Sequence, residues 1–129
     1  MKRLVLEQLK TWRDKKDRKP LILRGARQVG KTWLLKEFGR TCFNSVCYVN
    51  LEQKDRLQGI FEGDIAVGDI IDQLSVYCGK RIQPQTTLII FDEVQEVPRA
   101  LNSLKYFAEE APEYAICCAG SPLGVALHE

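Results

Sequence analysis

The fold of this chain is decided by the stretch Gly25-Ala26-Arg27-Gln28-Val29-Gly30-Lys31-Thr32. It matches the pattern G-x-x-x-x-G-K-[ST], a loop whose backbone N–H groups point inward around a phosphate. Glycine at both ends permits the dihedral angles of such a loop and keeps Cβ atoms away from the phosphate. Lys31 can then reach the β- and γ-phosphates, and the Thr32 hydroxyl can bind Mg²⁺. The stretch therefore predicts a phosphate-binding loop.

The segments on either side of this loop fit a strand and a helix. Before it, Leu21-Ile22-Leu23 is a short apolar run, typical of a strand buried on both faces. After it, a helix is expected from about Lys31, with Gly39 placed to end it. The N-terminus of such a helix faces the anion, where unpaired N–H groups and the helix dipole favour negative charge. Its buried side is expected to hold Leu34, Leu35 and Phe38.

The rest of the chain continues this alternation of strands and helices. Such alternation indicates βαβ units, so we predict one α/β domain over residues 1–129, a three-layer αβα P-loop core with a parallel sheet. Three further strands are expected at Val46–Val49, Thr87–Phe91 and Tyr114–Ala119. Helices are expected over residues 2–13, around Leu57–Phe61, over Ile70–Cys78, and from Pro98 to before Pro112.

Two carboxylates, Asp92 and Glu93, follow the third predicted strand directly. In a parallel α/β sheet, ligands bind beyond the carboxyl ends of the strands, which places Asp92 on the same edge as the phosphate loop. A carboxylate there can hold Mg²⁺, usually through its water shell. Glu93 can polarise a water molecule for attack on the γ-phosphate. A solvated turn is the alternative explanation for an acidic pair at a strand end.

Four other residues are weaker candidates for the site. Asn50 ends the second predicted strand, where it either hydrogen-bonds Glu93 and holds it out of line or simply forms a turn. Ser121 follows the fourth strand, where it either contacts the γ-phosphate or caps a helix or turn. Trp33 borders the loop and is counted with the nucleotide-binding residues, although packing in the core is expected for its side chain. Arg27 faces either solvent or a neighbouring subunit.

Composition excludes several classes of protein. Hydrophobic residues make up 45% and charged residues 28% of the chain, as in folded soluble domains. No apolar run approaches the ~20 residues needed to cross a bilayer, and the N-terminus lacks a secretory signal, so we expect a cytoplasmic protein without membrane contact. The five cysteines form no Cys-x-x-Cys and the chain has one histidine, which argues against a zinc site. We predict reduced, mostly buried thiols.

The charges are divided unevenly along the chain. Residues 1–40 hold 13 Lys and Arg against 4 Asp and Glu, and the other 89 residues hold 6 against 13. A basic front of this kind either attracts phosphates and nucleic acid or is only a solvated face.

With these motifs in place, the chain resembles the AAA-type P-loop ATPases of bacteria and archaea, in particular the group that carries an uncharacterised C-terminal domain. The resemblance spans essentially the whole chain. It rests on the three blocks Leu23–Thr32, Ile90–Gln95 and Gly120–Val125, which occur in the expected order.

The resemblance implies ATP and Mg²⁺ as ligands. It assigns Asp92 to the metal, Glu93 to catalysis and Ser121 to sensing of the γ-phosphate. It also implies the spatial strand order 2-3-4-1. Such proteins are usually longer, with a fifth strand and a helical lid, so we expect this chain to be the front part of the ATPase domain, with weak hydrolysis on its own. No candidate arginine finger follows Ser121 in the sequence, and another subunit could supply one.

Three other functions are alternatives to an ATPase. A GTPase should show Asn-Lys-x-Asp, and no such run occurs; a small-molecule kinase needs a basic lid, and none is apparent. The third alternative is a module that binds nucleic acid or a protein client, with the nucleotide as a structural ligand. It is motivated by the basic N-terminal third of the chain.

Overall fold

The computed structural model describes residues 2–23 and 31–120, with residues 2–4, 31, 54 and 58 described by their backbone alone. Strands and helices alternate along the chain, as the sequence predicted. The strands are β1 (Leu21–Leu23), β2 (Ser45–Asn50), β3 (Thr87–Asp92) and β4 (Ala115–Ala119). The helices are α1 (Lys2–Asp14), α2 (Lys31–Cys42), α3 (Lys54–Leu57), α4 (Val67–Cys78) and α5 (Pro98–Glu110), with 3₁₀ turns η1 (Gln58–Phe61) and η2 (Val94–Glu96).

The four strands form one parallel sheet in the order β1-β4-β3-β2. This confirms the α/β fold and the strand order that the resemblance implied. Strands β3 and β4 are central and buried along their whole length. The register pairs Asn50 with Asp92, so the ends of β2 and β3 lie level at one edge of the sheet.

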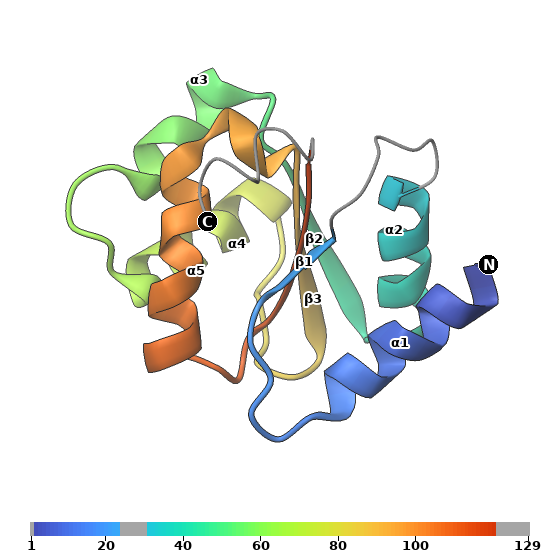
Figure 1. Cartoon of the computed structure of the whole chain (residues 1–129). Helices are drawn as coiled ribbons and strands as arrows, with labels where there is room; N and C mark the ends of the chain where they lie inside the picture. The colour runs from blue at the N-terminus through green and yellow to red at the C-terminus, as the bar shows by residue number, and fades with distance from the viewer. Residues whose placement is uncertain (1, 24–30, 121–129) are drawn as a thin grey trace.

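The two faces of the sheet are covered by different helices, which gives the three predicted layers (Figure 1). Helices α1 and α2 cover one face, and α4 and α5 cover the other. Successive side chains of a strand point to opposite faces. In β3, for example, Leu88 and Ile90 belong to the core under α2, whereas Ile89 and Phe91 belong to the core under α4 and α5.

Gly39 does not end helix α2, contrary to the prediction. The helix continues to Cys42, and Gly39 is buried against the sheet. A Cβ atom at this position would lie 2.3 Å from Cγ2 of Val46. The glycine is therefore explained by the close approach of α2 to β2, and not by a turn at the end of the helix.

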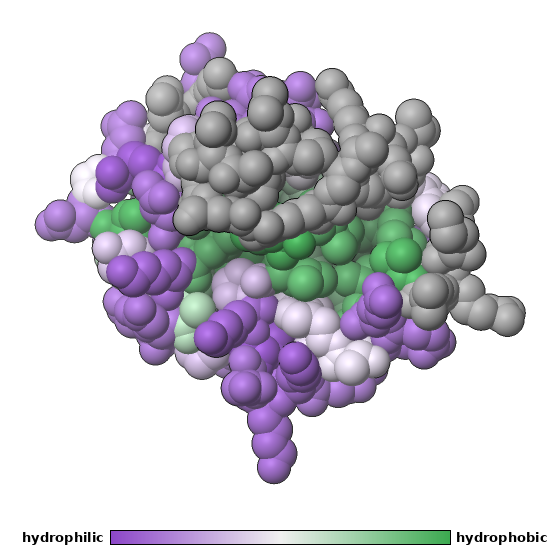
Figure 2. Space-filling model, in the orientation of Figure 1, coloured by the Kyte–Doolittle hydropathy of each residue, from purple (hydrophilic) through white to green (hydrophobic). Residues whose placement is uncertain are grey.

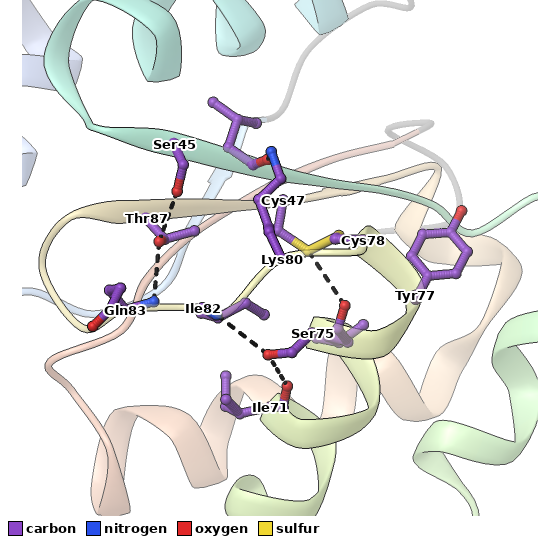
Figure 3. The surroundings of a disulfide bond; sticks show 12 residues. Ser45, Cys47, Ile71, Ser75, Tyr77, Cys78, Lys80, Ile82, Gln83 and Thr87 are labelled. Atoms are coloured by element: carbon purple, nitrogen blue, oxygen red, sulfur yellow. Dashed lines mark hydrogen bonds between the residues drawn. A yellow bond between two sulfur atoms is a disulfide. The ribbon is translucent and has the colours of Figure 1, made fainter.

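The prediction of reduced thiols is wrong for one pair. Cys47 in β2 and Cys78 at the end of α4 form a disulfide, with Cα atoms 5.7 Å apart (Figure 3). Cys117 and Cys118 are free and buried, and Cys42 is free and half-buried. The disulfide joins residues 31 positions apart on a strand and a helix. Cysteine number and spacing do not reveal such a pair, because it depends on how the helix packs on the sheet.

The surface view shows apolar side chains in the middle of the face turned to the viewer, where β1 runs at the near edge of the sheet (Figures 1 and 2). The three residues of β1 are partly exposed, as expected for an edge strand. Among the described helices, none has both the length and the apolar character required to cross a bilayer.

Candidate functional site

The structure brings together two residues that the sequence assigned to one metal site. The Thr32 hydroxyl, in the first turn of α2, donates a hydrogen bond of 2.8 Å to Oδ2 of Asp92 at the end of β3. Asp92 shares its strand face with Leu88 and Ile90, which face α2, so its carboxylate points toward the start of that helix. The prediction that Asp92 and the head of α2 share one edge of the sheet is confirmed for Thr32.

The Asp92 carboxylate is buried, with 7% of its residue surface exposed, and both of its oxygens accept hydrogen bonds. Oδ2 also accepts a bond of 2.5 Å from the Tyr48 hydroxyl, and Oδ1 accepts one of 3.0 Å from the backbone N–H of Glu93. Donors of this kind compensate for the burial of a charged group.

Tyr48 was not predicted as a site residue. It is the fourth residue of β2, and the sequence marks it only as part of a β-rich run. Alternation gives a signal: Tyr48 has the same parity as Val46, which packs on the α2 face, so it points to the face that Asp92 occupies. A tyrosine two residues before the end of β2 can therefore reach the end of the neighbouring strand.

The Tyr48 ring is held between the sheet and helix α2. The ammonium nitrogen of Lys36, one turn after Thr32, lies 4.0 Å from the centre of the ring. The pKa of Tyr48 is raised above its usual value, chiefly because the hydroxyl is partly buried and then because it lies beside the Asp92 carboxylate. Tyr48 therefore stays protonated, as a hydrogen-bond donor, throughout the physiological pH range.

Glu93 has a left-handed backbone conformation, with φ 54° and ψ 49°. This conformation is uncommon for a residue with a Cβ atom, and it tends to occur at functional sites. The Glu93 carboxylate accepts a hydrogen bond of 2.8 Å from the side-chain amide of Gln95. Gln95 also lies against Gly120, where a Cβ atom would come within 2.3 Å of its Oε1. Gln95 thus lies between Glu93 and the end of β4, a position that the sequence analysis did not identify.

The structure gives Asn50 the turn that was one of its two expected roles. Its side-chain oxygen Oδ1 accepts a hydrogen bond of 3.1 Å from the backbone N–H of Glu52. An action of Asn50 on Glu93 stays a prediction.

The expectation that Trp33 packs in the core is wrong. This residue keeps 52% of its surface exposed, because it lies on the outer side of the first turn of α2. On the same helix, in contrast, Leu35 and Phe38 are fully buried and Leu34 is half-buried. Trp33 therefore presents an indole ring at the surface one residue after Thr32.

Several predicted site residues lie outside the described part of the chain. These are the loop residues Gly25, Ala26, Arg27, Gln28, Val29 and Gly30, together with Ser121. The backbone of Lys31 is described as the first residue of α2. Gly120, which precedes Ser121, follows β4 at the same sheet edge as Glu93 and Gln95.

The chemistry of the described oxygens fits Mg²⁺. A carboxylate and a hydroxyl are hard oxygen ligands, and Mg²⁺ in phosphate-binding sites is typically held by one or two carboxylates together with the phosphates. The Thr32 hydroxyl donates its hydrogen bond to Asp92, so the lone pairs of its oxygen can face a metal. The arrangement can therefore hold a cation beside an anion at the head of a helix.

Comparisons with known proteins agree with this geometry. The model of a family described as an AAA domain matches residues 17–129. A search of the curated proteins found no match. Among solved structures, the Orc1 protein of Aeropyrum pernix, in complex with DNA, matches with a TM-score of 0.58 and 17% sequence identity. The match covers 99% of this chain and 40% of that chain, so this chain spans less than half of the length of its structural neighbour.

At this identity, the structural match speaks for the fold alone, and the family model extends over most of the chain. The α/β fold with its parallel sheet agrees with the structural match. This chain belongs to the AAA-domain family of P-loop ATPases.

Proposed function

We propose that this chain binds ATP together with Mg²⁺ and hydrolyses it, coupling hydrolysis to a conformational change. The observation that carries the proposal is the hydrogen bond of 2.8 Å between Thr32 and Asp92. It joins the last residue of the phosphate-loop motif to the carboxylate at the end of the central strand β3. Two of the expected metal ligands thus lie within one hydrogen bond of each other.

In the proposed site, the backbone N–H groups of Gly25–Thr32 and the Lys31 ammonium bind the phosphates. The oxygens of Thr32 and Asp92 hold Mg²⁺, which neutralises charge that develops on the phosphates during the reaction. Ser121 contacts the γ-phosphate, and Trp33 lies beside the nucleotide.

The catalytic step is assigned to Glu93. Its carboxylate accepts a proton from the water molecule that attacks the γ-phosphate. Two observations support this role: the backbone of Glu93 is left-handed, as is common at functional sites, and the hydrogen bond from Gln95 restrains its carboxylate. Asn50 is proposed to restrain Glu93 before activation.

A melting-temperature series tests the binding part of this proposal. The chain is heated with ATP, GTP or ADP, each with and without Mg²⁺, and Lys31→Ala serves as the control variant. A ligand that binds only the folded state raises the melting temperature, and at a fixed concentration a tighter ligand raises it more. We expect the largest increase with ATP and Mg²⁺ and no increase in Lys31→Ala. An equal increase in Lys31→Ala would reject the phosphate loop as the binding site.

A second candidate function is the binding of nucleic acid, for which the basic N-terminal region is the motivating feature. Part of its positive charge is not exposed to a nucleic acid, because Arg18 is buried. The Arg18 guanidinium donates hydrogen bonds to the side chain of Gln85 and to the carbonyl of Glu113. Three other basic side chains form ion pairs within the same region: Lys10 with Glu7, Arg13 with Asp14, and Arg40 with Glu37.

A salt titration of DNA binding separates this candidate from the first. Binding through phosphate contacts falls steeply as salt rises, because bound counterions are released. Affinity that is absent at low salt, or that does not respond to salt, would exclude the nucleic-acid function. Assembly with further copies of the chain, or with a protein client, is compatible with either candidate and is measured by mass in solution with and without ATP.

A further inference from the structure

The Asp92 carboxylate has few acceptor positions left. An ionised carboxylate offers about four lone-pair sites, two on each oxygen. Oδ2 uses both of its sites, for the hydroxyls of Thr32 and Tyr48, and Oδ1 uses one for the N–H of Glu93. One acceptor position therefore remains, on Oδ1, and the plane of the carboxylate is fixed by three donors from three different segments.

Tyr48 is the donor of these three that has no other assigned task. Thr32 belongs to the phosphate-loop motif, and the N–H of Glu93 is part of the backbone. The Tyr48 hydroxyl approaches from the neighbouring strand β2, at 2.5 Å from Oδ2. Lys36 closes the other side of the tyrosine, with its ammonium 4.0 Å from the ring centre. The hydroxyl is thus held in place from both the sheet and helix α2.

We propose that Tyr48 is a positioning residue that sets the Mg²⁺ affinity of the site by fixing the orientation of the Asp92 carboxylate. The inference rests on the proposed function, because it concerns the same metal. With Tyr48 in place, the carboxylate presents its one remaining acceptor position in a constant direction, toward a metal-bound water molecule. Thr32 is also affected, since it shares Oδ2 with Tyr48 and orients its lone pairs by donating to that oxygen.

Partners of this kind in the outer shell of a metal site commonly contribute ~10- to 100-fold to metal affinity. The Tyr48→Phe variant removes the hydroxyl and keeps the ring, and with it the contact with Lys36. The carboxylate then rotates more freely, and fixing its orientation costs free energy when the metal binds.

The test measures the Mg²⁺ concentration that gives half of the ATP-dependent increase in melting temperature, at saturating ATP. We expect Tyr48→Phe to raise this concentration by about tenfold or more. The matched control is Tyr77→Phe, which removes a hydroxyl that donates to Gln53 at 2.6 Å, away from Asp92. Tyr77→Phe should leave the Mg²⁺ concentration unchanged. An unchanged or lower concentration in Tyr48→Phe would overturn the proposal.

A double-mutant cycle distinguishes positioning of Asp92 from a general loss of structure. In an Asp92→Asn background, Tyr48→Phe should have little further effect on the response to Mg²⁺, because the group that it positions is already altered. A full, independent effect of Tyr48→Phe in that background would contradict the inference. If the wild-type chain shows no melting increase with ATP at any Mg²⁺ concentration, the proposed function itself fails, and this inference fails with it.

Discussion

The two faces of the central sheet differ in what their side chains do. On the face covered by α4 and α5, the side chains are almost all apolar, and the Cys47–Cys78 disulfide and the edge-to-face pair Phe61–Phe91 lie there. On the face covered by α2, the apolar core is smaller, and toward the strand ends it gives way to Tyr48, Asp92 and Thr32. Neighbouring residues of one strand therefore have different functions. Side chains on one face stabilise the sheet, and side chains on the other face form the site.

The largest expected effect on stability comes from Phe91, on the structural face. Phe91→Ala should lower the free energy of unfolding by about 3–5 kcal/mol, because it empties a fully buried aromatic position. Denaturant unfolding followed by circular dichroism measures this change. A loss below 1 kcal/mol would show that the face under α4 and α5 is not the main source of stability.

The disulfide on the same face should contribute somewhat less. Closing a loop over a sequence separation of 31 residues stabilises a protein by about 3.7 kcal/mol in the chain-entropy account. Cys78→Ala should remove this stabilisation under oxidising conditions and have a much smaller effect under reducing ones. Cys42→Ala, at a free cysteine, is the control. Both variants should keep the wild-type response to Mg²⁺ with ATP. A weaker response in Cys78→Ala alone would contradict the claim that one face of the sheet stabilises the fold and the other forms the site.

On the edge of the sheet that carries the site, the expected effect is on turnover. Glu93→Gln should keep ATP binding and lower the hydrolysis rate by at least about a hundredfold, within the usual contribution of a general base. The rate is measured as phosphate release, and binding is followed separately by melting temperature. Unchanged turnover would remove Glu93 from the mechanism and leave its unusual backbone conformation unexplained.

The sequence predicted the fold well because its signals are local. The apolar runs of the strands and the alternation of elements can be recognised from short segments, and the structure confirms both. The phosphate-loop motif is also local, but Gly25–Gly30 lie outside the described residues. The pairing of Thr32 with Asp92 also followed, since parallel strands end at a common edge.

The errors concern contacts between segments that are distant in sequence. The prediction that Gly39 ends a helix is wrong, because the role of this residue depends on the distance between α2 and Val46. The Cys47–Cys78 bond depends on where the end of α4 meets β2. The sequence gives no direct sign that Tyr48 belongs to the site, because its partner Asp92 is 44 positions away. Each of these contacts is set by packing between elements, which residue type and spacing do not encode directly.

The most direct test of the account compares the wild-type chain with Asp92→Asn in the ATP melting experiment as Mg²⁺ is added. Asp92→Asn preserves the shape of the side chain and removes its charge, while Phe91, its neighbour on the opposite face, stays intact. We predict a cooperative melting transition in both proteins and a much smaller Mg²⁺-dependent increase with ATP in Asp92→Asn than in the wild type. An Mg²⁺-dependent increase of the same size in Asp92→Asn would contradict the assignment of the metal site.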